Sequence, residues 1–203
     1  MSPIWNPAFR LVLASGSVTR MRLLQAAGLP VEPIPSKLDE RAIEAEQTEI
    51  DAAGLALTLA KAKALSVSRS APGALVVGAD QVLSFEGRVF HKSATREEGL
   101  STLAALAGKT HRLISAFALA QDGRLVVADA DAAEMTMRAL DEAALRDYFE
   151  TAGPSVLDSV GVYHWEGIGV HLFARVIGDH STILGLPMLK LLAALRGLGA
   201  VRF

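Results

Sequence analysis

The sequence predicts a mixed α/β fold in which a central sheet is flanked by helices. Short apolar runs of strand length alternate along the chain with segments whose apolar residues recur at helical spacing. Two hairpin signals, Glu86-Gly87 and Asp122-Gly123, interrupt this alternation in the middle of the chain. The 203 residues are 51% apolar and 21% charged, which is typical of a globular chain with a substantial core. Interleaved strands and helices with hairpins between them favour a mixed sheet.

The first predicted unit is a strand, a tight polar turn and a helix. Residues 10–14 form an apolar run typical of a buried strand, and Ser15-Gly16-Ser17 follows directly. Apolar residues recur at helical spacing from 19 to 27, and Gly28 is placed to end that helix. Residues 31–34 form a short strand between two prolines, so we expect it at an edge of the sheet.

An acidic stretch, residues 37–51, precedes the next helix and strand. Most of its six carboxylates are expected on a solvated loop or helix face. Asp51 is expected to begin a helix that Pro72-Gly73 ends. Residues 75–80 then form a second buried strand, which is expected to end on the carboxylate of Asp80.

The remaining elements follow from the same patterns. Further strands are predicted at residues 81–85, 88–90, 113–120, 125–128 and 168–177, and further helices at 95–107, 141–150 and 187–195. No repeat or long linker is present, so one domain is expected over residues 1–203, with a shallow division near residues 80–106.

Composition narrows the classes of function and partner. Twenty Lys and Arg against 22 Asp and Glu give a formal net charge of −2, which argues against nucleic-acid binding through bulk electrostatics. The absence of cysteine excludes disulfides, thiolate nucleophiles and Cys-based metal sites. No apolar run approaches the ~18 residues of a spanning helix, and residues 1–10 do not resemble a signal peptide. We therefore expect a cytoplasmic protein without a membrane partner.

The first candidate site is the strand-to-helix turn from Ser15 to Arg20. Free N–H groups at a helix N-terminus attract anions, and Gly16 allows a close approach of the backbone. The hydroxyls of Ser15 and Ser17 and the guanidinium of Arg20 would add donors to phosphate oxygens. The turn lacks the glycine spacing of a Walker loop, and an ordinary helix cap with a surface arginine is the alternative.

The second candidate is Asp80, whose carboxylate could bind a divalent cation or accept a proton from water. The alternative is a strand-end residue that caps a turn. Gln81 would point the opposite way on an extended strand. Taken singly, Lys61 and Lys92 are expected to be solvated lysines, and the spacing of the five histidines does not indicate a metal site.

Residues 126–131 superficially match the strand and DxD motif of aspartyl-phosphate phosphatases, in which the first carboxylate attacks phosphorus. That family places the motif near its N-terminus. Here it lies on the second arm of a predicted hairpin, so Asp129 and Asp131 are better interpreted as alternating residues on the wet face of a strand.

Several segments, in the same order, resemble the Maf family of nucleoside triphosphate pyrophosphatases over residues 11 to about 195. The opening family motif, Leu-Ala-Ser-x-Ser-Pro-Arg-Arg-x-x-Leu-Leu, corresponds to residues 13–24. The other matching segments are Asp39-Glu40, Lys61-Ala62-Lys63, Gly78-Ala79-Asp80-Gln81, His91-Lys92-Ser93, residues 103–111, Gly161-Val162-Tyr163, Gly178-Asp179-His180 and Leu184-Gly185-Leu186-Pro187.

This resemblance implies an elongated sheet with a cleft between two lobes, similar to inosine triphosphatases. It also implies hydrolysis of a nucleoside triphosphate to the monophosphate and pyrophosphate, with Mg²⁺ or Mn²⁺. By the resemblance, Asp80 activates the water and binds metal with Glu40, and the triphosphate is held by Ser15, Ser17, Arg20, Lys61 and Lys92. A homodimer is implied as well. A nucleotide-binding regulator of septum formation with little turnover is the alternative.

The specificity positions of the family fall at Thr19, Gln81 and Glu166. Gln81 and Glu166 match the branch similar to 7-methyl-GTP hydrolases, whose Trp is replaced by Thr19. A carboxylate facing the base suits guanine, which carries adjacent N–H donors. Val18 and Thr19 replace Pro-Arg of the opening motif, and Ser93 replaces a Pro after Lys92.

Overall fold

The computed structural model describes residues 4–47 and 50–203. Within these residues, seven strands form one mixed sheet in the order β2-β1-β3-β5-β6-β7, with β4 paired to β3. The strands are β1 (Arg10–Leu13), β2 (Val31–Pro33), β3 (Ala74–Phe85), β4 (Arg88–Phe90), β5 (Thr110–Gln121), β6 (Arg124–Met137) and β7 (Phe173–Ile177). The predicted mixed sheet is therefore confirmed.

The α-helices are α1 (Val18–Ala26), α2 (Glu40–Ala45), α3 (Ala52–Ser68), α4 (Arg96–Leu106), α5 (Glu142–Ala152), α6 (His180–Ile183) and α7 (Met188–Gly197). Two 3₁₀ helices, η1 (Pro154–Asp158) and η2 (Ile168–Leu172), complete the elements. The chain divides into two compact units. The first comprises residues 1–81, 114–131 and 180–203, and the second comprises residues 82–113 and 132–179.

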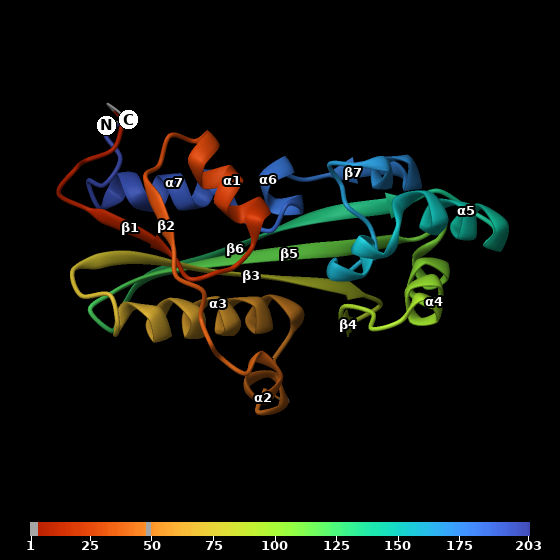
Figure 1. The fold of residues 1–203 in the computed structure, drawn as a ribbon, viewed down its shortest axis with the longest axis horizontal. Helices are drawn as coiled ribbons and strands as arrows, with labels where there is room; N and C mark the ends of the chain where they lie inside the picture. Colours follow the sequence, from red (N-terminus) through yellow and green to blue (C-terminus); the bar gives the residue numbers. More distant parts are fainter. Residues whose placement is uncertain (1–3, 48–49) are drawn as a thin grey trace. The chain divides into compact units, whose positions relative to one another are not determined.

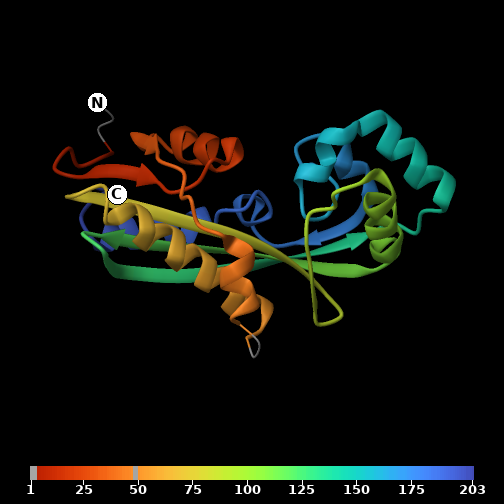
Figure 2. The same cartoon turned by 60° about the horizontal axis from the view of Figure 1, so that its bottom comes forward.

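In the first unit, β1 pairs in parallel with both β2 and β3, and β2 lies at the edge as predicted. Side chains that alternate along β1 and β3 enter two cores on opposite faces. Leu11, Leu13 and Val77 pack with residues of α1 and α7, whereas Val12 and Val76 pack near the end of α3. Figures 1 and 2 show α1 and α7 over one face of this part of the sheet and α3 along the other.

Glycine sets the distance between α3 and β3. A Cβ on Gly78 would lie 2.2 Å from the carbonyl oxygen of Ala60 and 2.5 Å from the backbone nitrogen of Ala64. No other residue would allow the helix and strand to approach this closely. This contact presses α3 against the residues that immediately precede Asp80.

Both predicted hairpins form. Glu86-Gly87 joins β3 to β4, and Asp122-Gly123 joins β5 to β6. All four turn residues have positive φ, between 49° and 75°, as a two-residue turn that follows the twist of its strands requires. The hairpin strands are longer than predicted, because β5 and β6 extend through both compact units.

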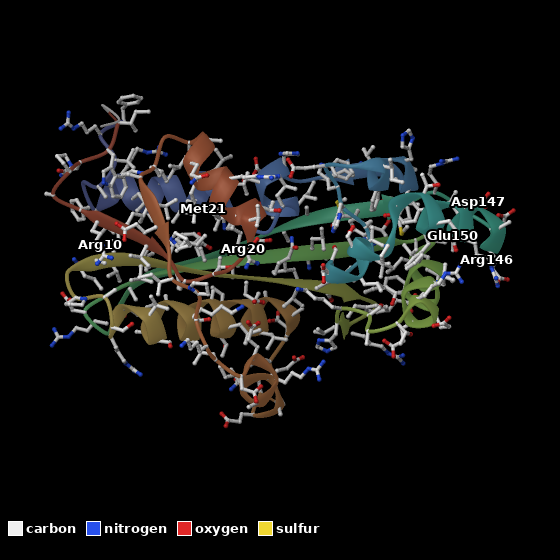
Figure 3. The ribbon with its side chains drawn as sticks, in the orientation of Figure 1. Arg10, Arg20, Met21, Arg146, Asp147 and Glu150 are labelled. Atoms are coloured by element: carbon white, nitrogen blue, oxygen red, sulfur yellow. The ribbon has the colours of Figure 1, made fainter. Side chains whose placement is uncertain are left out.

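In the second unit, α4 and α5 pack against each other at Gly99, where a Cβ would lie 2.9 Å from Leu157 and 3.2 Å from Phe149. The charged side chains of Arg146, Asp147 and Glu150 project from the exposed face of α5 (Figure 3). Beside these helices, Trp165 and Tyr163 pack edge-on against Phe173.

One predicted strand was wrong in its first half. Residues 168–177 form η2 followed by β7, so only residues 173–177 are extended. Gly169 explains the difference, because a Cβ there would lie 2.5 Å from the carbonyl oxygen of His164. The close turn around this glycine is incompatible with a continuous strand.

Candidate active site

The turn after β1 is built by the hydroxyls that the sequence singles out. The Ser15 hydroxyl accepts a hydrogen bond from the backbone N–H of Ser17 at 3.2 Å. Ser17 is the N-cap of α1, and its hydroxyl accepts from the backbone N–H of Arg20 at 3.3 Å. Ser15, Ser17 and Arg20, which are predicted to bind phosphate, are thus linked by hydrogen bonds through the turn and the first turn of α1.

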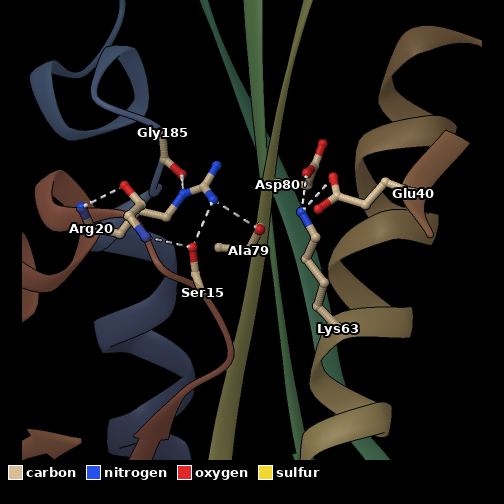
Figure 4. A network of polar contacts seen from close by, with 8 residues as sticks. Ser15, Arg20, Glu40, Lys63, Ala79, Asp80 and Gly185 are labelled. Atoms are coloured by element: carbon tan, nitrogen blue, oxygen red, sulfur yellow. Dashed lines mark hydrogen bonds and ion pairs between the residues drawn. The ribbon is translucent and has the colours of Figure 1, made fainter. Parts of the chain in front are cut away.

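Arg20 is tied into this loop and to a segment far along the chain. Its Nε donates to the carbonyl oxygen of Gly185 at 2.8 Å, and its Nη1 donates to the carbonyl oxygen of Ala79 at 3.1 Å and to the Ser15 hydroxyl at 3.3 Å (Figure 4). Burial lowers the pKa of Arg20, against the opposing effect of Asp80 and Glu40. A surface arginine, which was the alternative, does not describe this residue.

Asp80 lies on the other side of β3, where it faces α3 (Figure 4). Lys63 donates to Oδ1 of Asp80 at 2.7 Å, and its ammonium also lies 2.8 Å from Oε2 of Glu40. Lys63 and Asp80 are only 6% and 7% exposed, whereas the Glu40 side chain is half exposed. One buried ammonium thus joins two carboxylates that lie 40 residues apart in the sequence.

Burial raises the pKa of Asp80 above its ordinary value, although Lys63 and Arg20 favour its charged form. Only Oδ1 of this carboxylate is engaged by Lys63, and no hydrogen bond to Oδ2 is found within residues 4–47 and 50–203. A carboxylate with a raised pKa and a free oxygen is chemically suited to accept a proton.

The same pair of carboxylates suits a hard divalent cation. Mg²⁺ and Mn²⁺ prefer oxygen ligands, and Mg²⁺ is commonly bound by one or two carboxylates while substrate phosphates and water complete its coordination. Asp80 and Glu40 provide two carboxylates that already converge on one cation, the Lys63 ammonium. In the part of the chain that the structure describes, no group of three His, Cys, Asp or Glu side chains could hold a metal by itself.

Asp80 does not end its strand, and this prediction was wrong. β3 continues to Phe85 because Val82, Leu83 and Phe85 are also buried. β1 is the element that stops, since Leu13 pairs with Val77 and the chain then turns away through Ser15. Asp80 therefore lies beyond the end of the neighbouring parallel strand, and Gln81 points to the opposite face, as strand alternation predicted.

Lys63 belongs to this candidate site through its contacts with Glu40 and Asp80, whereas the sequence predicts a role for Lys61 of the same Lys-Ala-Lys segment. Residues two apart in a helix are rotated by about 200° around its axis, so Lys61 and Lys63 lie on nearly opposite faces of α3. Lys63 follows Leu59 and precedes Val67 on a buried stripe with a spacing of four residues. A lysine within an apolar stripe of a helix is the sequence signal that could have indicated a buried Lys63. The predicted role of Lys61, which is half-buried, stays a prediction.

Other predicted site residues lie elsewhere. Thr19 is half-buried in the first turn of α1. Lys92 and Glu166 are exposed on loops of the second unit. Ser93, which replaces the family proline, is 9% exposed, and its hydroxyl hydrogen-bonds with that of Thr102 on α4 at 3.3 Å. The roles predicted for Lys92, Thr19 and Glu166 stay predictions.

Asp129 lies on β6 and is exposed. Its carboxylate pairs with Lys190 at 3.1 Å and accepts a hydrogen bond from the backbone N–H of Ala130 at 2.7 Å. A surface carboxylate with these partners fits the wet face of a strand better than a buried phosphatase nucleophile. Within the described residues, no helix is both long and apolar enough to span a membrane.

Two relatives in sequence agree with the resemblance. A nucleoside triphosphate pyrophosphatase of Nitrobacter winogradskyi is 46% identical over 193 residues, which cover 95% of this chain and 96% of that protein. A 7-methyl-GTP pyrophosphatase of Mesorhizobium japonicum is 46% identical over 194 residues, with 95% and 98% covered. A HAM1 protein of Coxiella burnetii shows a partial structural likeness, with a TM-score of 0.42 and 19% identity over 64% of this chain and 73% of that one.

The family model described as Maf-like protein matches residues 10–198, which include Ser15, Arg20, Lys63 and Asp80. The matched region therefore contains both the Ser15–Arg20 loop and the lysine-bridged carboxylates, and the chain belongs to the Maf family.

Proposed function

We propose that this chain is a nucleoside triphosphate pyrophosphatase that uses a divalent cation, Mg²⁺ or Mn²⁺. The observation that carries the proposal is Asp80, a buried carboxylate with a raised pKa and a free oxygen, held by Lys63 beside Glu40. The names of the relatives support the same activity. Hydrolysis would yield the nucleoside monophosphate and pyrophosphate.

In the proposed reaction, Asp80 accepts a proton from water as the water oxygen bonds to the α-phosphorus. The bond from this phosphorus to the α–β bridging oxygen breaks, and pyrophosphate leaves with the electron pair. The raised pKa of Asp80 makes its carboxylate a stronger base than an exposed aspartate. Lys63 orients the carboxylate through Oδ1 and leaves Oδ2 for the water.

The triphosphate requires compensation of its negative charge. We propose that Ser15, Ser17 and the N-terminus of α1 bind phosphate oxygens and that Arg20 holds this loop in shape. Asp80 and Glu40 would hold the divalent cation, which would neutralise charge on the phosphates when bound. Lys61 and Lys92 are further proposed phosphate ligands, which come from the family resemblance alone.

The family resemblance also supports proposals on the preferred nucleobase, the cellular location and the oligomeric state. Gln81 and Glu166 favour a 7-methyl-GTP-like purine, a substrate class that the name of the Mesorhizobium relative also states. We further propose a cytoplasmic homodimer. A regulator of septum formation would bind nucleotides and release little pyrophosphate.

Pyrophosphate release from a panel of standard and methylated nucleoside triphosphates tests the proposal, with Mg²⁺ or Mn²⁺ present. Release from at least one nucleotide, dependent on the cation and lost in Asp80→Asn, is the expected result. Binding without release from any nucleotide would contradict the enzyme and favour the regulator. Orthophosphate release that survives Asp80→Asn would favour a phosphatase instead.

A further inference from the structure

The two carboxylates of the Asp129–Asp131 segment, which superficially matches a phosphatase motif, have different partners in the structure. Asp131 is half-buried on β6, and its Oδ2 accepts a hydrogen bond from the hydroxyl of Thr182 at 3.0 Å. Thr182 belongs to α6 and is fully buried. Asp129 is exposed and pairs instead with Lys190 on α7. Only Asp131 thus reaches into the interior of the first compact unit.

The segment that Asp131 contacts is too short to keep its shape alone. α6 comprises four residues, and a single helical turn is not stable in water without tertiary contacts. The hydroxyl of Ser115 on β5 donates to the carbonyl oxygen of Thr182 at 2.7 Å. Thr182 is therefore fixed to two neighbouring strands, to β6 through its side chain and to β5 through its carbonyl group.

The turn after α6 connects Thr182 to Gly185. The backbone N–H of Gly185 donates to the carbonyl oxygen of Thr182 at 3.1 Å. Gly185 has a φ of 96°, a conformation that favours glycine and allows this tight turn. The carbonyl oxygen of Gly185 accepts a hydrogen bond from Nε of Arg20 at 2.8 Å (Figure 4). The place of α6 therefore determines where Arg20 finds this acceptor.

Arg20 in turn holds the loop that is proposed to bind phosphate. Its Nη1 donates to the hydroxyl of Ser15, which also accepts a hydrogen bond from the backbone N–H of Ser17. Because Arg20 is half-buried, its guanidinium depends on acceptors within the protein. A displacement of α6 would move one of these acceptors and change the orientation of the guanidinium. The hydroxyl of Ser15 would then lose its fixed donor.

We infer that Asp131 is a positioning residue for phosphate binding, which acts through α6 and Arg20 on the Ser15–Arg20 loop. The link from the loop to phosphate rests on the proposed function, whereas the link from Asp131 to the loop does not. Removal of the carboxylate leaves every residue of the loop chemically intact and changes only their arrangement. Nucleotide binding should therefore weaken while kcat stays nearly unchanged, because the proposed base, Asp80, is untouched.

The test removes the hydrogen bond between Asp131 and Thr182 from either end. Asp131→Leu and Thr182→Val lack it, whereas Asp131→Asn and Thr182→Ser keep an acceptor and a donor. Hydrogen exchange of the backbone amides of residues 17–20, measured without nucleotide, should be roughly three- to tenfold faster in the first two variants. KM for the best nucleotide of the panel should rise by a similar factor, with kcat within about twofold of wild type. The two conservative variants should restore both quantities.

Asp129→Leu is the matched control, because it removes the exposed carboxylate of the same segment and should change neither quantity. The amides of α3 serve as an internal reference for general destabilisation. Thr182→Val keeps the shape of the side chain and decides the question if Asp131→Leu does not fold.

Three outcomes would overturn the inference: wild-type exchange of residues 17–20 in Thr182→Val, exchange that rises equally in α3, or an equal rise of KM in Asp129→Leu. Faster exchange with an unchanged KM would contradict the role in phosphate binding. If wild type binds nucleotides without releasing pyrophosphate, the proposed function fails, and the exchange rates of the loop still decide whether Asp131 positions it.

Discussion

The ammonium of Lys63 lies 2.7 Å from the carboxylate of Asp80, and both side chains are buried. The same ammonium reaches Glu40 at 2.8 Å. A cation that the chain itself supplies thus keeps two acidic groups together between α2, α3 and β3. This arrangement leads to predictions for each of its members.

Asp80→Asn should lower pyrophosphate release by roughly 10³-fold, because an amide cannot accept the proton of water in the transition state. Nucleotide affinity measured without added divalent cation should stay within about tenfold, since the proposed direct contacts to phosphate come from Ser15, Ser17 and the N-terminus of α1. Steady-state kinetics and calorimetric titration check the two quantities. Asp129→Asn, on an exposed strand position, is the control and should retain full rate. An Asp80→Asn variant with full rate would remove the proposed base.

Lys63→Met should destabilise the protein by about 3 kcal/mol, because it leaves the Asp80 carboxylate buried without its ion-pair partner. Urea unfolding measures this change. Mg²⁺ should raise the melting temperature of Lys63→Met more than that of wild type, since the cation can compensate the charge of both carboxylates.

Lys190→Met is the control for this variant, because Lys190 forms a half-exposed ion pair with Asp129. It should change stability by less than about 1 kcal/mol and should show the wild-type response to Mg²⁺. Equal stability losses in Lys63→Met and Lys190→Met would contradict a special role for the buried ammonium. Lys61→Met is expected to affect stability less than Lys63→Met, since it lies on nearly the opposite face of α3.

Gly78→Ala should destabilise the protein by roughly 3 kcal/mol, because its Cβ would overlap the backbone of α3 at Ala60 and Ala64. Displacement of α3 would also move Lys63 and lower activity in the variant that remains folded. Gly197→Ala, where a Cβ meets nothing within 4 Å, is the matched control. Denaturation curves that coincide for the two variants would show that α3 can shift to accommodate the Cβ without a loss of stability.

The stability of the protein should fall between pH 6.5 and pH 4 through His111. Burial lowers the pKa of His111 to about 4, so the folded state holds it neutral, whereas the unfolded chain protonates it near pH 6.5. The stabilisation is complete above pH 6.5 and is lost as the pH falls toward 4, by up to about 3 kcal/mol. Urea unfolding at several pH values measures this slope.

His111→Phe separates this effect from the carboxylates that titrate in the same range. Nε2 of His111 lies 2.7 Å from the hydroxyl of Tyr163, and its Nδ1 is buried without a hydrogen-bond partner in the part of the chain that the structure describes. The variant should be less stable at pH 7 but should depend less steeply on pH than wild type. Parallel pH profiles for the two proteins would be inconsistent with a neutral buried His111.

The sequence predicted most of the elements because their signals are local. Capping residues such as Ser17, Asp51 and Asp141 mark helix starts, and the hairpin dipeptides mark turns. The elements that were missed depend on distant contacts. α6 is a single helical turn without a periodic pattern, and η2 replaces a strand because of a close backbone approach at Gly169.

In the candidate site too, contacts between distant parts of the chain could not be predicted from the sequence. Asp80, Ser15, Ser17 and Arg20 could be proposed from the sequence because each belongs to a short motif, and all four lie in the first compact unit. Their roles stay predictions. The partnership of Lys63 with Glu40 and Asp80 could not be derived from spacing, since it depends on how α2 and α3 lie against β3. The bonds from Arg20 and Gln81 to residues 182–185 were inaccessible for the same reason.

The hydrogen bonds from Arg20 and Gln81 to residues 182–185 affect when the site can form during synthesis of the chain. The side chains of Arg20 and Gln81 are oriented by the backbone carbonyl groups of Thr182, Ile183 and Gly185. The ribosome adds these three residues about a hundred residues or more after Arg20 and Gln81. A nascent chain of 170 residues therefore contains Ser15, Lys63 and Asp80 but lacks the carbonyl groups that orient the side chains of Arg20 and Gln81. Ribosome-bound chains of increasing length should gain nucleotide discrimination only after this segment has left the exit tunnel.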